Sequence, residues 1–423
     1  MKKRTLFALS AFALLFAQSS QAQTPGGKYT TITGSGQTLY NIAIAPVIGG
    51  GRGGRTATKV MERDLTLCGV FKVLNRKGFL ANLRKEGTGI VVKKWTDIGA
   101  LGVIKARARR SGRGYSIDFF LYDTGKGAEP VLKKTYSGRS PRRLAHQFDN
   151  DVYFYFTKSK GIFLTKIAFT LSSRRKKVSN VYVMDYDGHG GGRISYTGNQ
   201  NILPNWAPGG RLVWTSLLWQ NPDLYISGGG RRARRLSRQP GLNSGAAFSP
   251  DGSKIAITMS RSGNSDIWLI SPSGKILRQL TKHGGIDASP TWSPDGSRIA
   301  FVSNRGGSAQ IYVMSSSGGG VRRLTFQGNY NQEPDWNPKP GSNLIAFTGR
   351  DGKGAYDIFT VDAKKGTIKR LTQGQGSCRS PTWSPNGRLV AYETTRGGIW
   401  VMDDEGLNQH QLKRYGTSPA WSR

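Results

Sequence analysis

An aromatic residue followed by a short turn segment recurs six times between residue 206 and residue 421. The spacings between successive copies are 42, 44, 44, 47 and 38 residues. A period in the forties with strand and turn content is typical of a β-propeller, in which each repeat forms one blade. The sequence therefore predicts a rigid propeller platform, and any enzymatic function needs separate support. The recurring aromatic residues are Trp206, Phe248, Trp292, Trp336, Trp383 and Trp421.

Each repeat contains the signals for four strands. In three copies the aromatic residue is followed by Ser-Pro-Asp-Gly or Ser-Pro-Asn-Gly, in which proline fixes φ and glycine takes up a positive φ. An alternating run such as residues 298–302 comes next, then a third strand such as 310–314 and a fourth such as 322–325. β-Branched and aromatic residues at period two, bounded by turn residues, predict strands.

The two ends of the repeat array are incomplete in complementary ways. The first repeat has predicted strands at 166–170, 181–185 and 192–195 but lacks the strand that precedes the turn in the other copies. Residues 418–422 form an unpaired strand at the other end. Moving this strand into the first repeat completes it and leaves no open sheet edge. We therefore predict a six-bladed propeller over residues 161–423 that is closed by the C-terminal strand, in preference to an open β-sandwich.

Residues 1–22 have the pattern of a secretory signal peptide. A basic start at Lys2 precedes an apolar stretch over residues 6–17, and Ser20-Gln-Ala22 is a small-x-small cleavage site. The apolar stretch is too short to span a bilayer. The mature chain is predicted to begin at Gln23, and because this residue is not cysteine we do not expect a lipid anchor. The predicted location is the periplasm of a two-membrane bacterium.

Residues 23–160 are predicted to form a separate, smaller α/β domain. Strands alternate with helices, which is typical of this class. Pro141 lies at the start of the last predicted helix, where its missing N–H costs least. The fold class is therefore α+β multidomain. Strands are predicted at 41–46, 70–74, 101–105 and 115–122, helices at 58–67, 95–99 and 140–157, and turns at 87–89 and 123–130.

A glycine-rich stretch in this domain has the spacing of a phosphate-binding loop. Residues 49–56 read Gly-Gly-Gly-Arg-Gly-Gly-Arg-Thr, after a predicted strand and before a predicted helix. Arg55 stands where such a loop needs lysine, and no acidic residue follows on a buried strand to hold Mg²⁺. We therefore expect a flexible loop that binds no nucleotide.

Other catalytic and metal-binding patterns are missing from the sequence. There is no Gly-x-Ser-x-Gly elbow and no His-Glu-x-x-His pair. The acidic stretches 185–188 and 403–406 lack the further oxygen ligands of a calcium loop and are predicted to be β-turns. The chain is predicted to be non-enzymatic, without catalytic residues, metal or cofactor. The four histidines, at 146, 189, 283 and 410, lack metal-ligand spacing and are expected to be loop or helix-face residues.

The only two cysteines, Cys68 and Cys378, lie in different predicted domains. Two cysteines cannot form a disulfide framework, and a single bridge between the domains is not implied. We expect two buried thiols, since a free cysteine packs as a small apolar residue.

The chain is strongly basic, with a formal net charge of +37. Without the three basic residues of the signal peptide the charge is 59 − 25 = +34, of which +16 lies in residues 24–160 and +18 in 161–423. Such a charge favours acidic partners, phosphorylated surfaces such as lipopolysaccharide, or nucleic acid. Export removes most nucleic-acid partners, so none is expected. The strongest basic runs are at 107–110, 174–177 and 231–235.

Three stretches point to a known family. Residues 141–168 contain Pro-Arg-Arg-Leu-Ala-His and lead into the first blade, residues 65–72 end in Cys-Gly-Val-Phe-Lys, and the chain ends near Pro-Ala-Trp-Ser. These stretches resemble, in order, the last helix and its junction, the Ser-Gly-x-Phe segment, and the closing strand of the TolB family. TolB proteins are the periplasmic propeller proteins of the Tol–Pal system. The resemblance extends over the signal peptide, the α/β domain and all six blades.

The resemblance implies a scaffold that binds two proteins. TolB proteins bind Pal, the peptidoglycan-associated lipoprotein, through the loops that enter the first strand of each blade, and they bind TolA through a mobile N-terminal segment. The Tol–Pal system supports outer-membrane integrity and constriction at cell division, and other outer-membrane lipoproteins are further candidate partners. On this chain the implied Pal-facing residues are Leu242, Asn243, Ser244, Ala288, Asn331, Gln332 and Glu333. The implied TolA segment is residues 23–33, with Gln23, Thr24, Lys28, Tyr29 and Thr30.

The sequence departs from the family pattern at both proposed sites. Leu242 and Ala288 replace residues that are His or Thr in the family, and the N-terminal segment is rich in glycine and basic residues. Two alternatives remain open. One is a stand-alone envelope propeller that binds acidic glycan or lipopolysaccharide, which the net charge favours, and the other is a propeller hydrolase.

Overall fold

The computed structural model describes residues 39–423 except for 174, 176, 197, 220, 229–232, 351 and 353. The chain divides into two compact units, one ending at Thr165 and the other spanning Lys166–Arg423. The predicted signal peptide and the implied TolA segment lie outside the described residues.

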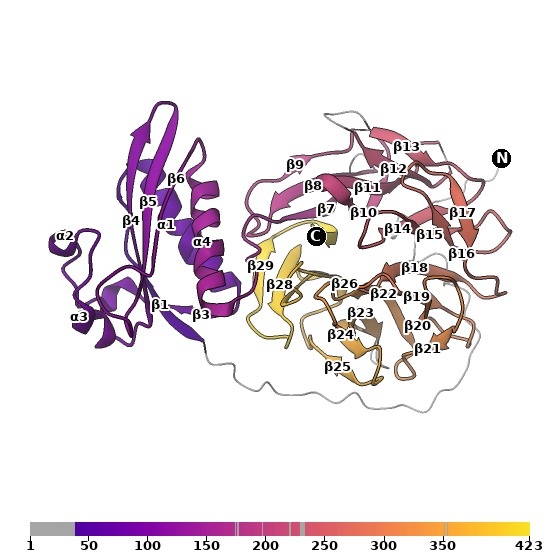
Figure 1. Ribbon diagram of the computed structural model, residues 1–423. Helices are drawn as coiled ribbons and strands as arrows, with labels where there is room; N and C mark the ends of the chain where they lie inside the picture. The colour runs from indigo at the N-terminus through magenta and orange to yellow at the C-terminus, as the bar shows by residue number, and fades with distance from the viewer. Residues whose placement is uncertain are drawn as a thin grey trace. The chain divides into compact units, whose positions relative to one another are not determined.

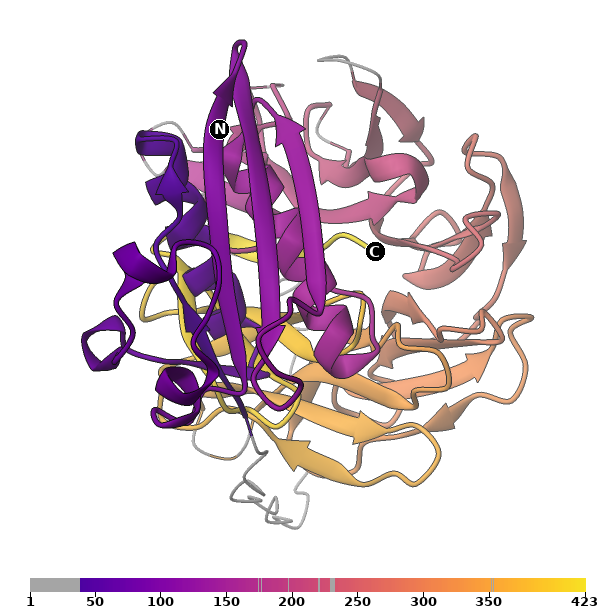
Figure 2. The same ribbon diagram turned by 60° about the vertical axis from the view of Figure 1, so that its left-hand side comes forward.

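A six-stranded sheet forms the centre of the first unit. Its order is β3-β1-β4-β5-β6, with β2 paired to β4, and the long strands β4, β5 and β6 are seen side by side in Figure 2. β1 runs parallel to β3 and β4, whereas β5 runs antiparallel to β4 and β6. The strands are β1 (Tyr40–Ile44), β2 (Ile48–Gly49), β3 (Phe71–Val73), β4 (Gly102–Ser111), β5 (Gly114–Asp123) and β6 (Leu132–Gly138).

Two long helices, α1 (Arg52–Leu67) and α4 (Pro141–Thr157), lie along one side of this sheet, as Figure 1 shows. α4 begins where the sequence predicted, because Ser140 accepts a hydrogen bond from the Arg143 N–H and Pro141 occupies the first turn. The stacked rings of Phe119 and Phe148, 4.7 Å apart, join β5 to α4. The other side carries the short elements η1 (Arg76–Gly78), α2 (Leu83–Glu86) and α3 (Val92–Thr96).

The prediction of a flexible glycine-rich loop before α1 is wrong. The helix begins at Arg52, six residues before the predicted start, and Gly53 and Gly54 are buried in its first turn. A Cβ atom at Gly53 would lie 2.2 Å from the ring of Tyr115, and one at Gly54 would lie 2.3 Å from the carbonyl oxygen of Gly49. These glycines therefore allow close packing of the helix against β5 and its own preceding loop.

Four other elements of this unit differ from the prediction. β4 continues to Ser111, because Ala106 and Ala108 face the core while Arg107 and Arg109 are exposed. The basic run 107–110 is thus part of a half-buried strand. β6 was not predicted, since it is a largely exposed edge strand with little apolar alternation. α3 lies three residues before its predicted position, and α2 was not predicted.

A buried ion pair lies beneath the short helices. The Nζ atom of Lys105 on β4 is 2.9 Å from Oε2 of Glu86, and the two side chains are 2% and 4% exposed. The same carboxylate oxygen accepts a hydrogen bond from the indole N–H of Trp95. The ammonium group also lies 5.1 Å from the centre of the Trp95 ring. Burial of this lysine therefore depends on one glutamate and one tryptophan.

The second unit is a six-bladed propeller with four antiparallel strands in each blade, which confirms the predicted fold class (Figure 1). The first two blades are β30 (Thr417–Trp421), β7 (Lys166–Ser173), β8 (Val178–Asp185), β9 (Gly192–Arg193), then β10 (Asn201–Ala207), β11 (Arg211–Ser216), β12 (Asp223–Ser227), β13 (Ala233–Ser237). The third and fourth are β14 (Asn243–Phe248), β15 (Ile255–Met259), β16 (Asp266–Ile270), β17 (Ile276–Gln279), then β18 (Asp287–Trp292), β19 (Arg298–Ser303), β20 (Gln310–Ser315), β21 (Arg322–Arg323). The fifth and sixth are β22 (Tyr330–Trp336), β23 (Leu344–Arg350), β24 (Tyr356–Asp362), β25 (Ile368–Arg370), then β26 (Cys378–Trp383), β27 (Leu389–Thr394), β28 (Ile399–Asp403), β29 (His410–Lys413).

The C-terminal strand closes the ring, as predicted. β30 pairs antiparallel with β7, so that Trp421 lies opposite Ile167 and Ala420 opposite Ala168. The indole N–H of Trp206 donates to the carbonyl oxygen of Ala420 from the second blade, at 2.8 Å. Closure therefore joins the last residues of the chain to the first two blades and leaves β7 paired on both sides.

The repeated sequence phrase is explained by packing at the end of each innermost strand. Trp292, Trp336, Trp383 and Trp421 are buried between neighbouring blades. The following turn is held by its own side chains, since the Ser293 hydroxyl donates to the Asp295 carboxylate at 2.5 Å. Hydrogen bonds from serine hydroxyls lower the pKa of this aspartate to about 2. Each phrase is thus a structural unit of one blade.

Candidate docking face of the propeller

The ends of the innermost strands define two faces of the propeller. At one face these strands begin, and we call it the amino face. It is formed by the loops that lead into each innermost strand and by the loops that join the second and third strands of each blade. Both sets lie at the same end of a blade because Asn201 pairs with Ser216, which pairs with Asp223. The opposite face, where the innermost strands end, is the carboxy face.

The innermost strands surround a central channel whose cavity measures about 140 Å³. Each of these strands contains an irregularity near its start, at a residue with φ between 49° and 61°. A proline follows in all but the third blade, where Ala246 stands instead. The irregularity turns the strand toward the channel. The six residues are Leu203, Gly245, Ser289, Glu333, Ser380 and Ser418.

Two glutamates of neighbouring blades lie near the channel, Glu333 on the innermost strand β22 and Glu393 on the second strand β27. Oε2 of Glu333 accepts hydrogen bonds from the Ser380 N–H (2.9 Å) and the Thr348 hydroxyl (2.8 Å). Oε2 of Glu393 accepts one from the Ser418 N–H at 2.6 Å. Burial, and secondarily the charge of Glu333, raises the pKa of Glu393 to about 7. A carboxyl group next to the channel-lining residue Ser418 thus has a pKa of about 7.

The raised pKa of Glu393 predicts a pH dependence of propeller stability. Between its unfolded pKa of 4.5 and its folded pKa of about 7, this carboxyl binds more protons in the folded than in the unfolded state. The free energy of unfolding should therefore fall as the pH rises through this window. Glu393→Gln should remove the decrease in the free energy of unfolding that ionisation of Glu393 causes. At pH 8 this variant should therefore be more stable than the wild type by about 1–2 kcal/mol. Urea unfolding at pH 5 and pH 8 measures the effect.

A control variant for this measurement is Glu129→Gln, because Glu129 is exposed in the first unit. Its stability should follow the wild type at both pH values. Equal stability of Glu393→Gln and wild type at pH 8 would contradict the assignment of the titrating group.

The structure places the residues implied by the family resemblance at the amino face but buries most of them. Asn243, Ser244, Ala288, Asn331 and Gln332 lie at the starts of innermost strands and are buried. Leu242 and Glu333 are half-buried.

Asn243 shows what the buried side chains do. Its amide donates to the carbonyl oxygens of Gln239 and Gly241 and accepts from the Ser237 hydroxyl. Asn331 likewise donates to Gln327. These side chains hold the shape of the incoming loops, so direct contact of their side chains with a partner remains a prediction.

Four exposed aromatic residues on the amino face were not singled out from the sequence. Trp219 and Phe326 are each 65% exposed, and Tyr196 and Tyr415 are also exposed. Each lies in a loop that leads into an innermost strand or joins a second strand to a third. Such loops have no apolar periodicity. In the sequence, only the loop position and the aromatic residue type could have indicated these exposed side chains. Large exposed aromatic side chains are typical contact residues of protein interfaces.

Arginine side chains lie over several aromatic rings of this face. The guanidinium of Arg379 is 3.7 Å from the centre of the Tyr356 ring, and that of Arg350 lies 5.5 Å from the same ring. Arg193 is 4.3 Å from the Tyr196 ring centre. These contacts are favourable and restrict the orientation of the guanidinium planes. The amino face thus combines exposed aromatic rings with oriented arginines.

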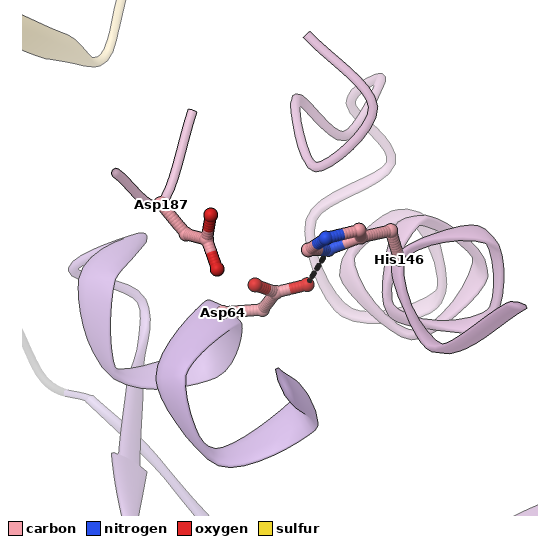
Figure 3. Close-up of side chains that lie close together, drawn as sticks. All are labelled: Asp64, His146 and Asp187. Atoms are coloured by element: carbon pink, nitrogen blue, oxygen red, sulfur yellow. Dashed lines mark hydrogen bonds and ion pairs between the residues drawn. The ribbon is translucent and has the colours of Figure 1, made fainter. Parts of the chain in front are cut away.

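The two long helices of the first unit are joined by buried polar groups. Figure 3 shows Asp64 of α1 beside His146 of α4, with Oδ2 and Nδ1 2.5 Å apart. Asp149 lies one turn further along α4, and burial together with the nearby Asp64 charge raises its pKa well above the ordinary range. His146 is therefore a buried helix-face residue, and its contact with Asp64 stabilises the packing of the two helices.

Potential metal and redox groups take structural positions in the described residues. Among the described residues of either single unit, no three ligand atoms of His, Cys, Asp or Glu lie close enough together to hold one metal ion. The stretch 403–406 is a turn closed by the Gly406 N–H and the Asp403 carbonyl, as predicted, and 185–188 is closed in the same way. Cys68 and Cys378 are free and buried, which confirms the expected thiols, and burial raises their pKa to about 12 and about 11.

No helix in the described part of the chain is both long and apolar enough to cross a membrane.

The fold and the amino face define a class of protein: a β-propeller with an attached α/β domain and a loop face suited to docking another molecule. A family model for the TolB beta propeller domain matches residues 153–423, and one for the TolB amino-terminal domain matches residues 29–129. The chain belongs to the TolB family, which confirms the resemblance found in the sequence.

Individual relatives agree with this assignment. The chain is 39% identical over 289 residues to the Tol-Pal system protein TolB of Anaeromyxobacter dehalogenans, and the match covers 64% of this chain and 63% of that protein. It is 34% identical to the protein of the same name from Bordetella pertussis, covering 60% and 68%. The crystal structure of TolB from Acinetobacter baumannii superposes with a TM-score of 0.79 at 24% identity, covering 91% of this chain and 97% of that one. It therefore shares the fold.

Proposed function

We propose that the protein is a non-enzymatic scaffold of a Tol–Pal system in the periplasm. In this proposal the amino face of the propeller binds Pal, and residues 23–33 bind TolA. The complex would support outer-membrane integrity and constriction during cell division. Membership of the TolB family and the similarity to relatives named Tol-Pal system protein TolB support this assignment.

The observation that carries the proposal is the exposed aromatic and arginine surface of the amino face. The loops of this face are held by buried side chains such as Asn243 and Asn331, so they are ordered before a partner arrives. A preordered surface loses less conformational entropy on binding. Trp219 and Phe326 supply exposed apolar area that a protein partner would bury.

The variant Trp219→Ala tests whether this face binds Pal. We expect at least a tenfold loss of affinity, about 1.4 kcal/mol or more, because an exposed tryptophan is a frequent contact residue of interfaces. Thermal stability should stay within about 0.5 kcal/mol of the wild type, because the side chain is 65% exposed. Isothermal titration calorimetry with the soluble Pal domain of the same organism measures the affinity.

A matched control is Leu407→Ala, which removes an exposed apolar side chain from a loop at the carboxy face. This variant should bind Pal with wild-type affinity. Wild-type affinity of Trp219→Ala, or an equal loss in both variants, would speak against docking at the amino face.

The proposed N-terminal segment adds a regulatory element. A short tail that folds onto TolA or onto its own domain can act as a switch. We propose that Pal docking and release of residues 23–33 are coupled. Spin labels at Lys28 would report tail mobility, and equal mobility with and without Pal would exclude the coupling.

The net charge of +37 favours a second candidate function, binding of acidic glycan or lipopolysaccharide. This function predicts tight binding to lipopolysaccharide vesicles with a steep dependence on salt. Genes for TolA-like and Pal-like proteins beside this one would favour the first function, and turnover of peptide or ester substrates would contradict both.

A further inference from the structure

The described residues of the amino-face loops include basic but no acidic side chains, and Asp351, between β23 and β24 in the sequence, lies outside the described residues. Among the residues that the structure describes in these twelve loops there is no aspartate or glutamate. The loops leading into the innermost strands are 194–200, 238–242, 280–286, 324–329, 371–377 and 414–416. Those joining second and third strands are 174–177, 217–222, 260–265, 304–309, 351–355 and 395–398. The same described residues contain the basic side chains Arg175, Lys177, Arg238, Arg261, Lys282, Arg305, Arg396 and Arg414.

The carboxy face differs, because its loops contain both signs. Asp251 and Asp295 follow the innermost strands β14 and β18, and Asp404 and Glu405 lie between β28 and β29. The segregation by face is therefore more than a consequence of the high net charge. This separation of charge becomes visible only when the strand pairing shows at which end of its blade each loop lies.

The carboxylates at the strand ends offset only a small part of the positive charge of the amino face, since Asp287 pairs with one basic loop residue, Arg305. Asp287 is buried and lies 2.7 Å from the guanidinium of Arg305. Asp223 is likewise buried and paired with Arg235 at 3.1 Å. A buried carboxylate that is paired in this way offers little negative charge to an approaching molecule. The exposed charge of the described residues in these loops is thus positive.

The kinds of side chain on this face match those of protein interfaces. Arginine and aromatic residues are enriched at such interfaces, whereas lysine, aspartate and glutamate are depleted. Six of the eight basic loop residues are arginines. Exposed Trp219 and Phe326 lie among these loops, and the guanidinium of Arg323 is 4.9 Å from the Phe326 ring centre. Large apolar rings favour a partner that buries them, as a protein does, over a phosphorylated glycan surface.

We propose that the amino face selects a protein partner whose docking surface carries aspartate and glutamate side chains around an apolar centre. The planar guanidinium group binds a carboxylate through two parallel hydrogen bonds. Complementary charge also accelerates the encounter of two proteins and rejects partners of like charge. The inference rests on the proposed function and specifies the chemistry of the Pal surface that this chain recognises.

Charge reversal on the two faces tests the inference. The double variant Arg261→Glu/Arg396→Glu changes two exposed arginines of amino-face loops. The matched control Lys339→Glu/Lys364→Glu makes the same change in charge at two exposed lysines of carboxy-face loops. Association with the soluble Pal domain of the same organism is measured by surface plasmon resonance in 50 and 500 mM NaCl, and circular dichroism checks that both variants are folded.

We expect the wild-type dissociation constant to increase at least about tenfold between the two salt concentrations. The amino-face variant should associate at least about tenfold more slowly at 50 mM NaCl, and the control should stay within about threefold of the wild type. Reversal of acidic residues on the Pal surface should restore the association rate of the amino-face variant and slow that of the wild type.

The possible failures are distinguishable. Wild-type binding that is insensitive to salt, or equal effects of the two double variants, would overturn the inference and leave the proposed function intact. Absence of wild-type binding at both salt concentrations would overturn the proposed function and the inference together. Salt-sensitive binding to lipopolysaccharide vesicles that only the amino-face variant loses, with Pal binding unchanged, would overturn the inference in favour of a polyanion.

Discussion

Deletion of residues 416–423 is expected to abolish cooperative folding of the propeller. The deletion removes β30, which pairs with β7 in the first blade. It also removes Trp421, whose side chain is buried and whose backbone N–H donates a hydrogen bond to the Thr382 hydroxyl. β7 would be left as a bare edge beside the channel. We expect a loss exceeding about 4–5 kcal/mol, seen by calorimetry as a missing or strongly lowered propeller transition.

Removal of Arg423 alone is the matched control for this deletion. Its guanidinium lies 2.6 Å from the Asp335 carboxylate, and the arginine side chain is partly exposed. A pair of this kind contributes about 0–1 kcal/mol. The control should therefore retain the wild-type transition. If the longer deletion also retained it, closure by β30 would not be what completes the ring.

Lys105→Met is expected to destabilise the first unit by about 3–5 kcal/mol. Removing the ammonium group leaves the buried Glu86 carboxylate without its ion-pair partner, and such uncompensated charges are costly. The double variant Lys105→Met/Glu86→Gln should recover most of this loss, because the glutamine is neutral and can still accept the Trp95 N–H. Urea unfolding of the full chain, followed by circular dichroism, measures both variants.

An exposed pair in the same unit provides the control. Lys93 and Asp97 are spaced four residues apart on the surface, with the lysine side chain 84% exposed. Lys93→Met should change the free energy of unfolding by less than about 0.5 kcal/mol. A loss in Lys105→Met no larger than that of the control would mean that the buried pair does not stabilise the unit.

The propeller was predictable because its information is local and repeated. The turn in each repeat is held by local hydrogen bonds, as Ser293 and Asp295 show. Placing the unpaired strand at 418–422 in the first blade was the arrangement that left no open sheet edge. The first unit was less predictable. Its α1 begins within a glycine run because of contacts with Tyr115, which is distant in sequence. β6 forms because β5 supplies a pairing edge, and its own residues show no strong pattern.

The docking face was only partly predictable for a similar reason. The family resemblance indicated residues at the starts of β14, β18 and β22, but a loop position does not show which side chains are buried. Asn243 turns back to its own loop, whereas Trp219 in a neighbouring loop is exposed. The charge segregation also required knowledge of the strand pairing, since amino-face and carboxy-face loops alternate along the chain.

The central claim, that the propeller is a Pal-binding scaffold, is tested most directly by titration calorimetry of residues 23–423 with the soluble Pal domain of the same organism at physiological salt. We predict saturable one-to-one binding. Absence of heat and of saturation at high concentrations of both proteins would contradict the claim.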